Sequence, residues 1–249
     1  MNEIMKQLIE RKSVRAFEDR EIDENIVQDI LKAAIMAPTA GNQQLYTILR
    51  ITDQEILDQL SRSCDNQPFI AKGKLVLLFL ADCLKWYDAY QYEDCCPRLP
   101  GEGDLMIALD DALIAAQNAV VAAWSYGIGS CYIGDIMENV EIHRELLNLP
   151  DYVFPAALLV FGYPTQQQKE RRKPDRVDMK YIVHENRYHR MYREELQGML
   201  EKKAGERDYG EWLQAFHRRK YNSDFAREMT RSVREYLKQY VDAKEDAAN

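Results

Sequence analysis

The sequence predicts a protein that combines α-helices with buried β-strands around one sizeable core. Two continuous apolar runs, at residues 75–81 and 155–162, have the length and composition of strands that are buried on both faces. Residues 26–37 instead carry apolar side chains at helical spacing, and residues 112–124 are apolar nearly all round, which is typical of a buried helix. A chain of 249 residues, 46% of them hydrophobic, is long enough for one large domain, alone or with an appendage.

Caps and turn residues set the order of the first elements. Residues 1–12 form an amphipathic helical pattern whose apolar side chains are expected to face inward, namely Ile4, Leu8 and Ile9. Asp23 is placed to cap a second helix, and Pro38 ends it because proline disfavours helical backbone in the residue before it. Gly41, in a polar loop at residues 38–44, allows the chain a positive φ before the next strand.

The remaining elements follow from the same signals. Further helices are expected at residues 53–63, 104–126 and 140–147, and two more strands at residues 46–51 and 130–133. Residues 86–103, rich in tyrosine, proline and acids, are expected to form an exposed excursion or lid. From residue 188 onward the sequence is charged, helical and tyrosine-rich. We therefore divide the chain into a domain at residues 1–188 and a helical extension at residues 189–249, packed on the core or on a partner subunit.

Composition argues against several classes of function. The formal net charge of −8 is unfavourable for a general nucleic-acid-binding protein. No early apolar run resembles a signal sequence, and residues 112–124 are too short to span a bilayer, so we expect a cytoplasmic protein without membrane attachment. The 5 cysteines lack C-x-x-C spacing and the 4 histidines lack an H-E-x-x-H pair, which favours reduced thiols and no metal site.

A cationic segment after the first helix is the first candidate binding site. In an extended backbone Arg11, Ser13 and Arg15 share one face, because side chains two residues apart point the same way. Two guanidinium groups with a hydroxyl between them suit a phosphorylated ligand, since guanidinium binds phosphate bidentately and keeps its charge near neutral pH. The alternative is a solvated basic surface turn.

Further polar segments are candidates for completing such a site. The loop at residues 38–44 concentrates amide and hydroxyl side chains where a strand begins, and these offer the donors and acceptors that a heterocycle needs. A second polar loop, at residues 65–69, also feeds a strand. The basic run at residues 169–176 is either a solvated loop or the second half of a phosphate clamp. Gly127 and Gly129 follow a helix and lack a third glycine, so they do not form a dinucleotide-binding fingerprint.

Three of these features, in this order, resemble the nitroreductase family of FMN-dependent, NAD(P)H-using oxidoreductases. They are the R-x-S-x-R segment, the P-[ST]-x-x-N-x-Q loop and the basic loop after the last core strand. Residues 127–134 also look like the glycine-containing strand of that family. The resemblance covers about residues 1–188, and the long C-terminal tail is similar to that of the larger members, which often use NADPH. It implies an α+β fold, with a mixed sheet flanked by helices, in an intertwined homodimer that binds FMN at the subunit interface.

The resemblance also implies a role for each matching residue. Arg11 would bind the FMN phosphate, Arg15 would lie near the N1/O2 edge of the flavin, and Gln67 would hydrogen-bond its pyrimidine edge. Lys173 and Arg176 would complete the phosphate clamp. The expected cofactor-binding residues are Arg11, Lys12, Ser13, Arg15, Thr39, Ala40, Asn42, Gln44, Gln67, Ile133, Gly134, Asp135, Lys173 and Arg176. No side chain is expected to be a catalytic residue, because the cofactor carries the chemistry.

The reaction that the resemblance implies is a ping-pong cycle. NAD(P)H would pass hydride to flavin N5 and leave, and a small-molecule electron acceptor such as a nitroaromatic or a quinone would then be reduced in the same space. The basic run Arg218, Arg219 and Lys220 is a candidate for recognising the 2′-phosphate of NADPH. The alternatives are another flavin reaction on this fold, such as reductive dehalogenation, flavin cleavage or enone reduction, a non-catalytic flavin-binding module, and a structural dimer without cofactor.

Overall fold

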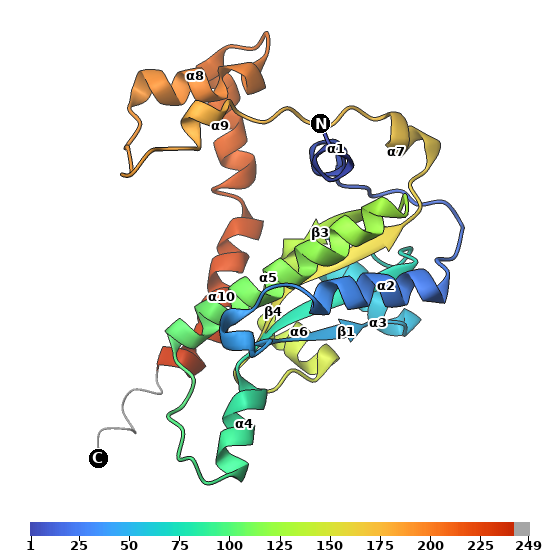
Figure 1. The fold of residues 1–249 in the computed structure, drawn as a ribbon. Coiled ribbons are helices and arrows are strands. Elements are labelled where there is room, and N and C mark those ends of the chain that lie inside the picture. The colour runs from blue at the N-terminus through green and yellow to red at the C-terminus, as the bar shows by residue number, and fades with distance from the viewer. Residues whose placement is uncertain (242–249) are drawn as a thin grey trace. The chain divides into compact units, whose positions relative to one another are not determined.

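The computed structural model describes residues 1–241 and confirms the α+β class. Within these residues a 4-stranded sheet has the order β1-β2-β4-β3 (Figure 1), formed by β1 (Tyr46–Arg50), β2 (Leu75–Asp82), β3 (Gly129–Ile133) and β4 (Val153–Gly162). Each neighbouring pair of strands is antiparallel, with Leu77 opposite Leu159 at the centre. In the described part of the chain, the mixed character that we expected is limited to one parallel bridge, between Ser13 and Ser130.

The two central strands separate two layers of helices. Both β2 and β4 are buried along their whole length, as their continuous apolar sequences predict. Alternate side chains of β2 point to opposite faces. Leu77 and Phe79 pack with α2 (Glu24–Ile35) and α5 (Glu102–Ser125), whereas Leu78 and Leu80 pack with α3 (Gln54–Ser63). Residues of α6 (Val140–Leu147) pack on this second face as well. The core therefore lies on both sides of the sheet.

The long helix α5 has two different apolar faces. By length and composition alone it is long and apolar enough to cross a membrane. One face consists of buried small residues that pack on α2 and the sheet, namely Ala112, Ala115, Ala116, Ala119 and Ala123. The other face carries large exposed side chains, namely Met106, Ile107, Leu113 and Ile114. The alanine face makes α5 a core helix of this fold, and the second face is left for another contact.

Most predicted boundaries are confirmed by the caps themselves. The Asp23 carboxylate accepts a hydrogen bond from the Asn25 N–H (2.8 Å) at the start of α2, and Asp53 caps α3 in the same way. Gly127 follows the C-cap of α5 with a φ of 73°, and Gly41 has a φ of 56° within the 3₁₀ turn η1 (Ala40–Asn42). These are positions where a side chain would be strained.

One sequence prediction is wrong in this part of the fold, and another is incomplete. Helix α1 (Glu3–Glu10) forms, but its apolar side chains are exposed rather than inward, with Ile4 65% and Leu8 43% exposed. An amphipathic pattern predicts that the apolar face will be covered, not which chain covers it. The excursion expected at residues 86–103 is largely exposed, but it begins within a helix that was not expected, α4 (Leu84–Tyr92), where the Asp82 carboxylate accepts hydrogen bonds from the first N–H groups.

The chain divides into two compact units. The first contains residues 1–171 and returns with residues 228–241, and the second contains residues 172–227. In the second unit the 3₁₀ turn η3 (Met179–Tyr181) precedes α8 (Arg193–Ala204) and α9 (Tyr209–Lys220), with Trp212 buried. The domain boundary at residue 188 stays a prediction. Residues 242–249 of the predicted extension lie outside the described residues.

The end of the described chain belongs to the first unit. Helix α10 (Asp224–Val241) runs from the second unit into the first, where Tyr236 and Tyr240 are fully buried. The Tyr236 ring packs against Phe154 of β4, with centroids 4.9 Å apart and a nearly perpendicular arrangement. Helix α10 is therefore part of the core of the first unit.

Candidate functional site

The cationic segment lies against strand β3. The Val14 N–H donates to the Ser130 carbonyl (2.9 Å), and Ser13 forms the parallel bridge with Ser130. Val14 is fully buried, in agreement with the alternation expected for an extended backbone. Gly129 makes this close approach possible, because a Cβ there would lie 2.5 Å from Cγ2 of Val14. The sheet thus holds the backbone between Arg11 and Arg15.

The guanidinium groups of Arg11 and Arg15 lie near Cys131 and Tyr132 of β3. The guanidinium of Arg11 lies 6.0 Å from the centre of the Tyr132 ring. Burial raises the pKa of the Cys131 thiol, and the positive charges of Arg15 and Arg11 oppose that shift. Within residues 1–241, no carboxylate forms an ion pair with Arg15. This region of the surface is therefore suited to an anion.

Lys12 makes a different kind of contact. Its ammonium donates to the backbone carbonyls of Lys169 (2.7 Å) and Arg171, at the C-terminal end of the short helix α7 (Gln166–Glu170). Arg171 donates in turn to the Ser13 carbonyl. A lysine commonly satisfies the last carbonyls of a helix in this way. Lys12 ties α7 to the cationic segment, and the cofactor contact implied for it stays a prediction.

A buried carboxylate, Asp111 of α5, organises the polar loop at residues 38–44. It is 3% exposed and accepts hydrogen bonds from the Ala40 N–H (2.9 Å), the Leu45 N–H (3.1 Å) and the Thr39 hydroxyl. The Thr39 oxygen also accepts from the Gln44 N–H (2.8 Å). Sequence reasoning missed Asp111, although an acid at the start of the apolar run at residues 112–124 is a usable signal, because a buried carboxylate needs donors.

The polar loop and the cationic segment lie at different places along α5. The loop is held by Asp111, whereas Ser130 follows the end of α5 by only a few residues. The helix rises about 1.5 Å per residue, so Asp111 and Ser125 are roughly 20 Å apart along its axis. Figure 1 shows the loop before β1 near one half of α5, and the chain after α1 near the other end. The Arg11 guanidinium lies beside Tyr132, whose hydroxyl donates to Gln117 (3.3 Å), about 9 Å from Asp111 along the axis. The two parts of the predicted site are therefore held at different places along α5.

The loop at residues 65–69 lies close to the 3₁₀ turn η2 (Gly134–Met137). Gln67 donates to the Cys64 carbonyl (2.9 Å), and the adjacent Ser63 carbonyl accepts from the Asn139 side chain (2.9 Å). Burial, with smaller effects of Asp135 and Glu138, raises the pKa of the Cys64 thiol. The structure therefore brings Gln67 and Asp135 into one region, and the cofactor contacts implied for them stay predictions.

The backbone at the end of β3 is open to a ligand. Gly134 is exposed, and a Cβ placed there would meet only the methyl group of Met137, at 3.9 Å. The side chain of Ile133, by contrast, is buried in the core beneath the sheet. A cofactor contact at Ile133 can therefore come only from its backbone.

A buried acid and a buried histidine lie beside η2, and sequence reasoning identified neither. Burial and the charges of Asp135, Asp65 and Glu228 raise the pKa of Glu138 to about 7. Burial lowers the pKa of His143, which favours the neutral ring, with Nδ1 donating to the Ile136 carbonyl (2.9 Å) and Nε2 accepting from the Ser63 hydroxyl (2.8 Å). Within residues 1–241 no group of three acids, cysteines or histidines is arranged to hold a metal ion.

The last two predicted site residues, Lys173 and Arg176, belong to the second unit. There, Arg172 forms an ion pair with Asp175 (2.8 Å). This pair neutralises the negative charge of Asp175, which stands inside the basic run at residues 169–176. Arg176 donates to the Pro174 carbonyl (3.3 Å) and lines a cavity of about 340 Å³ within the unit. The phosphate contacts implied for Lys173 and Arg176 stay predictions.

Comparison with known proteins agrees with the fold and with these motifs. The model of the nitroreductase family matches residues 8–163. An NADPH-dependent oxidoreductase of Staphylococcus aureus is 30% identical over 179 residues, which span 71% of this chain and 70% of that protein. The solved structure of B. megaterium NfrA2 has a TM-score of 0.80 at 27% identity and covers 96% of this chain and 98% of its own.

A second solved structure, the NfrA1 nitroreductase of B. subtilis, has a TM-score of 0.76 at 26% identity over 91% of this chain and 98% of its own. The family match includes the cationic segment, the polar loop and strand β3. The agreement extends from the sequence motifs to the arrangement of the sheet and its helices. The chain is therefore an enzyme of the nitroreductase family.

Proposed function

We propose that this protein is a homodimeric, FMN-dependent oxidoreductase. It takes hydride from NAD(P)H and reduces a small-molecule electron acceptor such as a nitroaromatic or a quinone. The observation that carries the proposal is the cationic segment held against β3, together with the open backbone at Gly134, which follows the last residue of the same strand. The relative in S. aureus is named an NADPH-dependent oxidoreductase and the B. subtilis neighbour a nitroreductase, which supports the same class of reaction.

The residues beside β3 fit a phosphorylated, planar cofactor. Arg11 and Arg15 supply positive charge at a place where the sheet holds the backbone rigidly. Phosphate is bound well by guanidinium, which offers paired donors and does not lose its charge. Gly134 leaves room for a flat ring to approach the backbone. We assign the phosphate to Arg11 and Ser13, and the electron-rich edge of the ring to Arg15.

When it is bound, FMN supplies the hydride chemistry that no side chain of this protein can provide. The protein's part is to bind the cofactor and to orient it. Positive charge at Arg15 would stabilise negative charge on the nearby edge of the ring. Gln67 would hydrogen-bond the pyrimidine edge, and Asp135 and the backbone of Ile133 would lie beside the ring. Lys173 and Arg176 would add to the charge around the phosphate.

A second copy of the chain would complete the site. The loop residues Thr39, Ala40, Asn42 and Gln44 are held at Asp111, at a different place along α5 from the cationic segment, and the family resemblance favours a site shared by two subunits. Two exposed apolar faces are available for a dimer contact, the one on α1 and the large-residue face of α5. Apolar patches of this kind are typical of interaction surfaces. We therefore assign the polar loop to the site of the partner subunit.

The cytoplasm is the proposed location. All five cysteines, which lie within the described residues, are free thiols. Free thiols are typical of a reducing compartment. This supports a location where NAD(P)H is also available as the electron donor.

The first test is an absorption spectrum of the purified protein, followed by anaerobic addition of NADPH and then NADH. We expect a flavin spectrum that bleaches, and the faster donor identifies the preferred nucleotide. Turnover with nitroaromatics or quinones, rather than halogenated phenols or enones, then identifies the acceptor class. Protein that neither contains nor takes up FMN would contradict the proposal.

A pair of arginine variants sharpens this test. Arg11→Ala should weaken FMN binding by about 1.5–3 kcal/mol, the scale of a hydrogen bond to a charged group, or roughly tenfold to a hundredfold in Kd. Arg50→Ala is the matched control, because Arg50 lies at the end of β1 and pairs with Glu24 on the surface. Equal FMN affinity in the two variants would mean that Arg11 does not bind FMN and that the cationic segment is a basic surface turn.

A further inference from the structure

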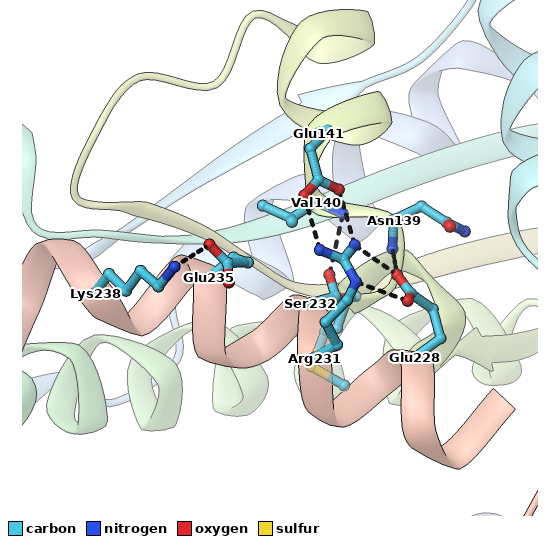
Figure 2. Close-up of polar contacts among 9 residues, drawn as sticks. Asn139, Val140, Glu141, Glu228, Arg231, Ser232, Glu235 and Lys238 are labelled. Carbon is cyan, nitrogen blue, oxygen red and sulfur yellow. Dashed lines mark hydrogen bonds and ion pairs between the residues drawn. The ribbon is translucent and has the colours of Figure 1, made fainter. Parts of the chain in front are cut away.

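The N-terminus of α6 is capped by another helix. Its own N-cap residue, Asn139, has a left-handed backbone with a φ of 51° and makes no side-chain cap. The first N–H groups of a helix have no partner within that helix. Here the Glu228 carboxylate accepts from the Asn139 N–H (3.2 Å), and the Ser232 hydroxyl accepts from the Val140 N–H (3.0 Å). Both acceptors come from α10, as Figure 2 shows.

Ser232 joins the two ends of the turn that precedes α6. Its hydroxyl donates to the Met137 carbonyl (2.7 Å) while it accepts from the Val140 N–H. The side chain is fully buried, so water cannot replace it. One hydroxyl group thus fixes the distance between the end of η2 and the start of α6.

Arg231 holds the other capping residue, Glu228, in place. Its guanidinium forms an ion pair with Glu228 (2.8 Å) and another with Glu141 on α6 (2.8 Å), as Figure 2 shows. Arg231 is about half exposed, so these pairs add little to stability by themselves. Their geometric effect is to direct the Glu228 carboxylate at Asn139.

The turn held in this way carries the open backbone of the candidate site. Met137 is the last residue of η2, and its methyl group lies next to Gly134. The Asp135 carbonyl accepts from the Glu138 N–H (3.0 Å), which closes the turn. A chain of direct contacts therefore runs from Ser232 through Met137 to Gly134.

We propose that Ser232 and Glu228 are positioning residues for the flavin site. They fix the Gly134–Met137 turn so that its backbone is presented to the cofactor in one conformation. A rigid site avoids the cost of ordering the turn at the moment of binding. This inference rests on the proposed function, because it concerns the same cofactor, but it concerns residues far from the cationic segment in the sequence.

The test compares Ser232→Ala and Glu228→Ala with the matched control Lys238→Ala. Lys238 lies on the same helix, and its ion pair with Glu235 stays within α10 (Figure 2). Glu228→Gln is the conservative variant, since its amide oxygen can still accept from Asn139. The measurements are amide hydrogen exchange at residues 134–140 without cofactor, the Kd for added FMN, and the visible spectrum of the bound flavin.

In the two alanine variants, amide hydrogens at residues 134–140 should exchange faster and the spectrum of bound flavin should change. Their Kd for FMN should rise about fivefold or more, which is the range of ordinary coupling between sites. Glu228→Gln should restore most of the affinity, and Lys238→Ala should match the wild type. Unchanged FMN affinity and spectrum in both alanine variants would overturn the inference alone, since α10 would then be a structural cap only. Wild-type protein that binds no FMN would overturn the proposed function and, with it, this inference.

Discussion

Replacing Glu138 by glutamine should stabilise the protein at alkaline pH and change it little near pH 5. Glu138 is 5% exposed and directly follows η2. Burial, followed by the charges of Asp135, Asp65 and Glu228, raises the pKa of its carboxyl from 4.5 to about 7. Between these two values the folded protein binds a proton that the unfolded chain has lost, so the free energy of unfolding falls as pH rises. Above pH 7 the loss is complete.

The size of the effect follows from the difference between the two pKa values of Glu138. A difference of one pKa unit corresponds to about 1.4 kcal/mol, so the ionised carboxylate costs the folded protein about 3 kcal/mol at pH 8. At pH 5 the same cost is under about 1 kcal/mol, because the folded protein still holds the proton. Glutamine has a similar shape and no charge at either pH, so it removes the cost without emptying the site.

The assay is urea unfolding of wild type and Glu138→Gln at pH 5, 6.5 and 8, at one protein concentration and without added ligands. The advantage of the variant should grow by about 2–3 kcal/mol from pH 5 to pH 8. Glu145→Gln, an exposed acid on α6, is the control and should show no such growth. An advantage that is constant with pH, or that the control shares, would refute this account of the buried carboxyl.

Three further variants test the site and the subunit contact. Asp111→Ala removes the acceptor of the half-buried Ala40 N–H and the buried Leu45 N–H, so urea unfolding should show a loss of about 3 kcal/mol. Unchanged stability would contradict the organising role of Asp111. Gly129→Ala forces a Cβ into Val14, and we expect a loss of about 1–3 kcal/mol in the same assay together with weaker FMN binding. Leu8→Glu places a charge on the exposed face of α1 and should give monomers in analytical ultracentrifugation, where an unchanged sedimentation coefficient would exclude this face from the dimer contact.

The sequence predicts the sheet well because its signals are local. The strands β2 and β4 are buried on both faces, so every position is apolar and the run stands out without knowledge of its neighbours. The caps Asp23 and Asp53 are equally local. Helix α4 was missed for the opposite reason. Its first N–H groups donate to Asp82 at the end of a strand, one residue before the N-cap position, and a tyrosine-rich segment without an apolar face carries little helical signal of its own.

The candidate site was predicted segment by segment, but not its supports. The cationic segment and the polar loop each carry their chemistry in a short stretch of sequence. Asp111 and Ser232 act on backbone groups more than 60 positions away, at residues 45 and 140. A hydrogen bond of this kind depends on which helix packs beside which turn, and no spacing rule encodes it. The residues that would contact a ligand are therefore easier to predict than the residues that hold their backbone in place.

The two faces of α5 explain why a sequence pattern could predict a buried helix but not its neighbours. An apolar pattern all round says that both sides are covered. The structure separates the sides by size, because alanines allow close packing on the sheet, whereas Leu113 and Ile114 lie on the other side and are 42% and 40% exposed. The apolar face of α1 is exposed in the same way. In the proposed homodimer a second copy would cover both faces, so one subunit contact would explain why these apolar side chains are exposed in the single chain.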